Sequence, residues 1–416
     1  MKIAIVCGDD VVAEQCGPEG AVGDDCGQLC AALATHGHDV TAFVRRRATI
    51  PETTTSDTAT EHGYRTVAVA AGPVAAIPPA QVLPYLGDWA AELAAVWSSD
   101  PPDVVHALGW LGGLAAQLAA KRQGLPTVQS FYGLTTLTQP DRAGRHPDGS
   151  ERARLEPLLA RNATWVTAGS SDDVSALARL RRSRARLSVL SAGVDVDRFT
   201  PVGPALARTD LHRIVCVAPD PSPDSGFDTT ICALPKIPAA ELVIAESAPA
   251  GSRHRQARRA LENLAAELRV SNRVRVAGPV GRLGEHTAEI QSPPIISYCL
   301  FFLDVVACTP RQAPRAAAAL QAMASGVAVV AVSTGALADT VVHSVTGLLV
   351  PPDNPRELAI ALKILQEQSF QCAGMGAAGR LRAESRFTWE RIAFDALNIY
   401  RQVSSLDERQ PVANAR

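Results

Sequence analysis

The chain has 416 residues, which is enough for two domains that each bury a hydrophobic core of ordinary size. Its 40 basic and 42 acidic residues leave a formal net charge of −2, and this balance argues against nucleic acid or an anionic membrane as the main partner. Nine cysteines occur without a Cys-x-x-Cys pair, so we expect neither a disulfide framework nor a metal site, and we predict that all nine are reduced.

The N-terminus and the apolar segments decide the expected compartment. The opening run MKIAIVCGD is too short for the apolar region of a signal peptide and predicts a first core strand. The longest apolar window, residues 316–332, is interrupted by Gln321 and Gly326, so it does not predict a transmembrane helix. The sequence therefore predicts a cytoplasmic protein without a transmembrane segment.

Short apolar runs alternate with amphipathic segments, which is the pattern of parallel sheets covered by helices on both faces. The strands predicted in the first half are 3–7, 39–44, 103–106, 126–131, 164–168 and 187–190. The helices predicted between them are 27–36, 111–122, 152–160 and 170–180. The first of these helices ends at Gly37, in keeping with the preference for glycine after a helix.

A second series of the same kind follows a proline- and glycine-containing stretch at 201–211, which we predict to be an interdomain linker. Its predicted strands are 213–217, 241–245, 274–277, 305–308, 327–332 and 347–350. Its predicted helices are 228–234, 256–267, one ending at Gly326, and 355–366. No Gly-x-Gly-x-x-Gly follows the first strand, so an α/β chain with two Rossmann-like domains, 1–200 and 212–385, is favoured over one nicotinamide-binding domain.

The segment from 311 to 332 carries the most specific signal. It reads RQAPRAAAALQAMASGVAVVAV, an apolar helix followed by a β-branched strand and the loop Ser333-Thr334-Gly335. This arrangement resembles the E-x7-E segment of the family-4 retaining glycosyltransferases. When the two are aligned on the Met-Ala-Ser-Gly at 323–326, the second glutamate falls on Gln321 and the first on Ala313.

Further segments resemble the same family in the same order along nearly the whole chain. They are GHDVT at 37–41, DVVHALGW at 103–110, GVDVDRF at 193–199, TGLLVPP at 346–352 and FTWERIA at 387–393. The resemblance implies the GT-B fold, in which two Rossmann-like domains face a cleft, the first holding the acceptor and the second the nucleotide-sugar. It also implies a C-terminal helix at 386–405 that crosses back to the first domain, followed by a flexible tail at 406–416.

The chemistry implied by the resemblance needs cations. Transfer from a nucleotide-sugar expels a diphosphate, whose developing charge must be met by fixed positive groups. Family members use an arginine and a lysine for this task, without a bound metal or a cofactor. Aligned on Gly226-Phe-Asp, these two positions are Asp220 and Ser225, while Ala313 lacks the carboxylate that would grip the sugar. Arg311 or Arg315 would restore phosphate binding if the local backbone differed.

Several positions keep part of the family pattern. Gln321 could still accept a hydrogen bond from the ribose, and Ser333, Thr334 and Gly335 form the expected donor loop of a UDP- or GDP-linked sugar. The catalytic candidates are Tyr132, which stands where the family has a histidine, and His106, for which a structural role is the alternative.

The glycine-rich loop before the first helix is a further ligand candidate. Gly20 and Gly23 could let backbone amides approach the donor, and an ordinary capped loop is the alternative.

Three functions follow from these residues. The first is a glycosyltransferase-like protein that moves a hexose from a nucleotide-sugar to an acceptor with retention, weakened or inactive because the acidic and cationic positions are lost. The second is a non-catalytic protein of the same fold that binds a ligand or a partner enzyme and regulates or scaffolds it. The third is a sugar-nucleotide epimerase of the same fold, which also depends on acidic residues.

Overall fold

The computed structural model describes residues 1–8, 24–46, 63–75, 77–135, 149–202, 210–246, 252–279, 304–311 and 315–407. The chain forms two compact units, each described by itself: unit 1 comprises Met1–Ser191 with Trp389–Arg416, and unit 2 comprises Ala192–Thr388. The domain boundaries, linker and tail expected from the sequence remain predictions.

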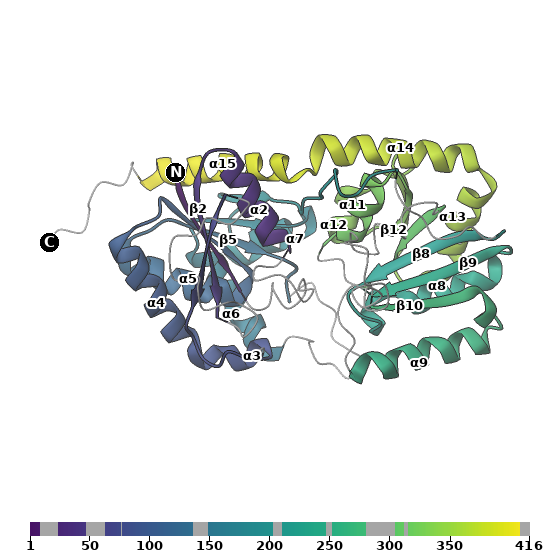
Figure 1. Cartoon of the computed structure of the whole chain (residues 1–416), viewed down its shortest axis with the longest axis horizontal. Coiled ribbons are helices and arrows are strands. Elements are labelled where there is room, and N and C mark those ends of the chain that lie inside the picture. Colours follow the sequence, from purple (N-terminus) through teal and green to yellow (C-terminus); the bar gives the residue numbers. More distant parts are fainter. Residues whose placement is uncertain are drawn as a thin grey trace, which may run out of the picture. The chain divides into compact units, whose positions relative to one another are not determined.

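Unit 1 is built on a parallel sheet with the strand order β3-β2-β1-β4-β5-β6-β7. Figure 1 labels β2 and β5 of this sheet. Its strands are β1 (Lys2–Cys7), β2 (Asp39–Arg45), β3 (Arg65–Val69), β4 (Val104–Leu108), β5 (Thr127–Phe131), β6 (Trp165–Ala168) and β7 (Leu187–Val189). β4 and β5 are buried along their whole length, because helices cover both faces of a parallel sheet.

The helices of unit 1 pack on both faces of this sheet. They are α2 (Asp24–Thr35), α3 (Pro79–Val82), α4 (Leu86–Ser99), α5 (Gly109–Gln123), α6 (Gly149–Asn162), α7 (Ser171–Arg181) and α15 (Trp389–Asp407). α2 and α15 contact each other and share one apolar cluster. α4, α5, α6 and α7 line the other face, where Trp89 and Trp97 of α4 are among the largest fully buried side chains.

Unit 2 repeats the architecture with the strand order β10-β9-β8-β11-β12-β13. Its strands are β8 (His212–Ala218), β9 (Ala240–Glu246), β10 (Val274–Pro279), β11 (Val305–Cys308), β12 (Ala328–Val332) and β13 (Gly347–Val350). Its helices are α8 (Phe227–Ala233), α9 (Ser252–Glu267), α11 (Ala317–Ala324), α12 (Gly335–Thr340), α13 (Pro355–Glu367) and α14 (Ser369–Arg386). α8 contacts α9 and α13, whereas α11 contacts α12 and α14.

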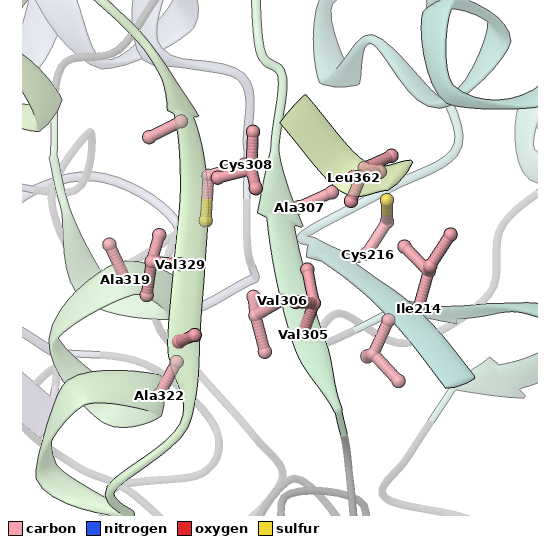
Figure 2. Packing of buried hydrophobic residues seen from close by; sticks show 14 of the residues in the cluster. Ile214, Cys216, Val305, Val306, Ala307, Cys308, Ala319, Ala322, Val329 and Leu362 are labelled. Carbon is pink, nitrogen blue, oxygen red and sulfur yellow. The ribbon is translucent and has the colours of Figure 1, made fainter. Parts of the chain in front are cut away.

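The core of unit 2 is made of small and β-branched side chains. Figure 2 shows Val305 and Val306 of β11 and Val329 of β12, with Ala319 and Ala322 of α11 in the same buried cluster. The alanines leave room for close packing of helices on the sheet.

A close helix approach is found at α14. A Cβ added to Gly376 would lie 2.1 Å from the carbonyl oxygen of Gly326, so only glycine fits at this point.

The expected α/β architecture of two parallel sheets is confirmed. In the described part of the chain, no helix is long and apolar enough to cross a membrane. Within the same residues, no group of three or more His, Cys, Asp or Glu side chains is arranged to hold a metal ion.

The prediction that all nine cysteines are reduced is wrong for one pair, because a disulfide joins Cys7 to Cys26 with an S–S distance of 2.09 Å. The fold brings the end of β1 and the start of α2 together. The two cysteines are 19 positions apart, and this spacing in the sequence does not predict their contact.

Candidate functional site

The predicted donor residues of unit 2 follow three neighbouring parallel strands, β8, β11 and β12. The carboxyl ends of these strands therefore meet at one edge of the sheet, which is where α/β proteins bind ligands. β8 leads to Asp220 and Ser225, β11 leads to Arg311, and β12 leads to the loop at 333–335.

The loop between β8 and α8 uses its polar side chains for its own turns. Asp220 Oδ1 accepts a hydrogen bond of 2.8 Å from the backbone N–H of Ser222. The Ser225 hydroxyl donates to the backbone carbonyl of Ser222. The sequence from Ile214 to Pro235 contains no lysine or arginine. The two positions at which the family resemblance implies cations therefore offer a carboxylate and a hydroxyl that are engaged inside the loop.

Gly226 fixes this loop against the end of β11. Its φ of 70° is left-handed, and an added Cβ would lie 1.7 Å from the carbonyl oxygen of Thr309. The Thr309 hydroxyl donates to the carbonyl of Gly226 over 2.9 Å, and the Arg311 backbone N–H donates to the carbonyl of Asp224 over 2.9 Å. The Gly-Phe-Asp sequence thus has a structural role that is independent of any ligand.

The side chain of Arg311 lies within a cluster of carboxylates. Its Nη2 donates to Asp228 Oδ2 over 2.8 Å, its Nε lies 3.1 Å from Asp353 Oδ1, and its Nη1 donates to the carbonyl of Pro223. Burial acts to lower the pKa of this guanidinium, but the hydrogen bond to Asp228 and the surrounding carboxylates raise it overall. We call Arg311, Asp228 and Asp353 the charged cluster of unit 2.

The remaining donor candidates lie around β12. Gln321 is half-buried in the middle of α11, and Ser333 is exposed just after the strand. Thr334 precedes α12, and its hydroxyl is buried without a hydrogen-bond partner among the described residues. Gly335 has a φ of 51°, which glycine adopts without strain. Ala313 lies outside the described residues.

The catalytic candidates of unit 1 differ in their surroundings. His106 is fully buried in β4, where Nδ1 lies 2.6 Å from the Tyr400 hydroxyl and Nε2 lies 2.7 Å from the Ser130 hydroxyl. Burial lowers the pKa of His106 to about 3, so the ring is neutral at pH 7. Both nitrogens are engaged, which supports the structural alternative for this residue.

Tyr132, directly after β5, is half-buried and packs against the cluster shared by α2 and α15. Gly20 and Gly23 lie outside the described residues. The candidates of unit 1 are thus a buried histidine in β4 and a half-buried tyrosine directly after the neighbouring strand β5.

Some residues that shape these sites carry no signal in the sequence. Tyr400 lies 294 positions from His106, and no local pattern connects them. Asp228 and Asp353 are 125 positions apart, yet both contact Arg311. Only the folded sheet reveals these partners.

Comparison with known proteins gives matches in both halves of the chain. Residues 20–193 match the family described as "Glycosyl transferase 4-like domain", and residues 212–368 match "Glycosyl transferases group 1". The chain is 29% identical over 396 residues to a D-inositol 3-phosphate glycosyltransferase of Xylanimonas cellulosilytica, covering 91% of this chain and 90% of that protein. A protein of the same name from Stackebrandtia nassauensis is 29% identical over 326 residues, covering 73% of this chain and 69% of its own.

Solved structures agree on the fold. Sucrose-phosphate synthase from Thermosynechococcus elongatus superposes with a TM-score of 0.80 at 24% identity, covering 97% of this chain and 99% of that one. Anabaena HepE, solved with UDP and glucose, gives 0.67 at 18% identity and covers 99% of this chain and 100% of its own. The two family matches and these neighbours show that the chain belongs to the GT-B glycosyltransferases of family 4.

Proposed function

We propose that this chain is a glycosyltransferase-like protein whose donor side holds a nucleotide diphosphate weakly or not at all, so that hexose transfer is slowed or lost. The observation that carries the proposal is the engagement of Arg311 by Asp228 and Asp353 at the carboxyl edge of unit 2. This arginine follows β11, its backbone N–H donates to the carbonyl of Asp224 in the loop after β8, and its charge is already paired with two carboxylates.

The electrostatics of the edge support the proposal. A departing diphosphate carries negative charge that fixed cations must offset, and removing one such donor from an active site typically slows the reaction by ~10²–10³-fold. Here the loop after β8 presents Asp220 and Asp224 instead of cations, and Asp228 follows at the start of α8. A diphosphate placed at this edge would meet like charges, and would have to displace carboxylates from Arg311.

The neutral residues at this edge support a weakened site more than an empty one. Gln321 keeps an amide oxygen that can accept a hydroxyl of a ribose, and the buried hydroxyl of Thr334 has no partner among the described residues. A UDP- or GDP-linked sugar would therefore find hydrogen bonds but little charge stabilisation.

The relatives favour a second candidate function, an active transferase. The relatives covering most of the chain are named D-inositol 3-phosphate glycosyltransferase. On this alternative the chain transfers a hexose to a phosphorylated polyol, and its compensating cations lie outside the described residues.

A third candidate function is that of a non-catalytic protein with the same fold. The chain would then bind a ligand or a partner enzyme, such as an active relative, and regulate or scaffold it in the cytoplasm. The intact cores of both units support this candidate, because folding does not depend on the lost charges.

The proposal is tested by donor turnover with a restored variant. Asp220→Arg and Ser225→Lys, combined with Ala313→Glu and Gln321→Glu, return the charges that the family resemblance implies. We expect the wild-type protein to release no UDP or GDP above background from the corresponding sugars, with or without an inositol phosphate acceptor, and the restored variant to gain release.

Ala377→Lys is the matched control, because it adds a positive charge at an exposed position of α14 next to Gly376, which lies at the amino end of β12 and not at the carboxyl end. This variant should stay inactive. Turnover by the wild-type protein comparable to that of ordinary transferases would overturn the proposal in favour of the active alternative. Binding of a partner enzyme without turnover would favour the scaffold.

A further inference from the structure

We propose that the Cys7–Cys26 disulfide is a reversible, redox-sensitive cross-link. It holds the first turn of α2 to the end of β1 when oxidised and releases this turn when reduced. The proposal concerns unit 1 alone and does not depend on whether unit 2 binds a donor. It assigns a covalent role to two of the cysteines that the composition of the chain leaves unexplained.

The disulfide joins the end of a strand to the start of a helix. Cys7 is the last residue of β1 and Cys26 is the third residue of α2, so the bond closes a covalent ring around the strand-to-helix connection. Cys7 lies at the carboxyl end of β1, and the carboxyl ends of parallel strands form the edge at which α/β domains bind ligands. The oxidation state therefore controls the attachment of α2 at this edge.

The first turn of α2 packs tightly around the bond. Cys7 and Cys26 are both fully buried, and a Cβ added to the next residue, Gly27, would lie 3.2 Å from the Tyr64 hydroxyl. Further along α2, Leu29 and Leu33 enter the apolar cluster that also contains Trp389 and Tyr400 of α15. The later turns of α2 are thus anchored by apolar packing, and the disulfide adds a covalent anchor at its N-terminal end.

A third thiol, that of Cys30, lies nearby but does not compete for the Cys7–Cys26 pairing. Cys30 lies one turn beyond Cys26 in α2, is fully buried, and is free. Burial raises the pKa of the Cys30 thiol far above its ordinary value, so it remains protonated and does not attack the disulfide. The other free cysteines of the described residues, Cys216, Cys232, Cys308 and Cys372, all belong to unit 2.

The redox step is an exchange with a small disulfide or dithiol. In oxidation, the two thiols lose two electrons and two protons to a low-molecular-weight disulfide, which becomes two thiols while the Cys7–Cys26 bond forms. A dithiol reverses the step. Because neither sulfur is exposed, both directions require local opening of the first turn of α2, and the exchange is slow in the native protein.

The chain itself provides a selective probe. All five tryptophans, at positions 89, 97, 110, 165 and 389, belong to unit 1, so tryptophan fluorescence reports the unfolding of unit 1. We would incubate the full-length protein with glutathione disulfide, or with dithiothreitol, and record thermal unfolding by fluorescence. Alkylation in denaturant followed by peptide mass spectrometry identifies the cysteines that are linked.

We expect a peptide that links Cys7 to Cys26 after oxidation, two additional alkylated thiols after reduction, and a fluorescence Tm several degrees lower in the reduced form. Hydrogen exchange should rise in the first turns of α2 on reduction and stay unchanged in α13 of unit 2. Cys30→Ala is the matched control and should keep the redox-dependent shift. Cys26→Ala should lose it.

The proposal is overturned by three outcomes. These are the absence of a Cys7–Cys26 peptide after oxidation, equal exchange of α2 in the two redox forms of the wild-type protein, and an unchanged shift in Cys26→Ala. The exchange measurement uses the wild-type chain, so it decides the question even if a cysteine variant fails to fold.

Discussion

Two groups of polar side chains, one in each unit, show how the same architecture treats polar residues differently. In unit 1, His106, Ser130, Thr167 and Tyr400 form a buried neutral cluster, with hydrogen-bond distances of 2.5 to 2.7 Å. In unit 2, Arg311, Asp228 and Asp353 form the charged cluster, whose side chains are 28%, 36% and 57% exposed. The first cluster is part of a core, and the second lies at a surface.

This contrast indicates which polar residues the fold needs. A buried neutral network must be satisfied completely, because each lost partner leaves an uncompensated polar group in an apolar environment. A half-exposed ion pair is screened by water and contributes little to stability. The charged cluster of unit 2 is therefore expected to contribute less to folding than the buried neutral cluster of unit 1.

The strongest test of this comparison is His106→Ala. Removing the ring leaves a cavity and takes away the partner of both the Tyr400 and the Ser130 hydroxyls, so we expect a loss of about 3 kcal/mol in the free energy of unfolding of unit 1. Urea unfolding followed by tryptophan fluorescence measures it. His36→Ala, at an exposed position, is the control and should change this free energy by less than ~0.5 kcal/mol. An equally small effect of the two variants would mean that the neutral cluster is not structural.

The second test extends the comparison to the backbone of unit 2. Gly226→Ala would place a Cβ 1.7 Å from the Thr309 carbonyl oxygen at a φ of 70°, and we expect it to destabilise unit 2 by about 2–3 kcal/mol. Gly374→Ala in α14 is the matched control, since its added Cβ meets no atom within 4 Å. This variant should stabilise the helix by ~0.5–1 kcal/mol, because alanine favours helices over glycine. Circular dichroism in urea measures both, and equal signs would contradict the expectation.

The third test uses the protonation of His106. Its pKa is about 3 in the folded protein and near its ordinary value of 6.5 in the unfolded chain, so the unfolded state binds the proton more tightly. Stability from this group is present above pH 6.5 and is lost as the pH falls toward 3, with a slope of at most ~1.4 kcal/mol per pH unit.

We would compare urea unfolding of unit 1 between pH 7 and pH 5 in the wild-type protein and in His106→Gln, which keeps polar contacts without titrating. The wild-type slope should be steeper. Equal slopes would show that His106 does not titrate on unfolding.

The smallest effect is expected for the charged cluster. Arg311→Ala should destabilise unit 2 by less than ~1 kcal/mol, because its ion pairs are partly exposed. The effect should shrink further in high salt, since screening weakens such pairs. Asp353→Asn removes the more exposed partner and should be milder still. A loss above ~2 kcal/mol for Arg311→Ala in urea unfolding would erase the contrast between the two clusters.

The sequence predicts the sheets well and some of the helices poorly. Strand β12 is a run of β-branched and small residues, which is typical of a buried parallel strand. Helix α14 is absent from the elements expected from the sequence, and its three glycines at 374, 376 and 379 argue against a helix by propensity. The structure explains one of these glycines, because Gly376 lies against the backbone of Gly326 and a side chain would not fit there.

The candidate sites also contain features that the sequence predicts and features that it does not. The positions of Asp220, Ser225 and Arg311 at one sheet edge could be predicted, because motifs that follow parallel strands meet at their carboxyl ends. The ion pairs of Arg311, the contact of His106 with Tyr400 and the Cys7–Cys26 bond could not be predicted. Each joins residues that are distant in sequence, and only tertiary packing brings them together.

The most direct test of the proposed function is isothermal titration calorimetry of the wild-type protein with UDP-glucose and with a GDP-hexose. The engagement of Arg311 by Asp228 and Asp353, together with Asp220 and Ser225 in the loop after β8, predicts no saturable binding at micromolar concentrations. The variant with restored charges should bind one of the donors under the same conditions. Micromolar binding of either donor by the wild-type protein would contradict the account.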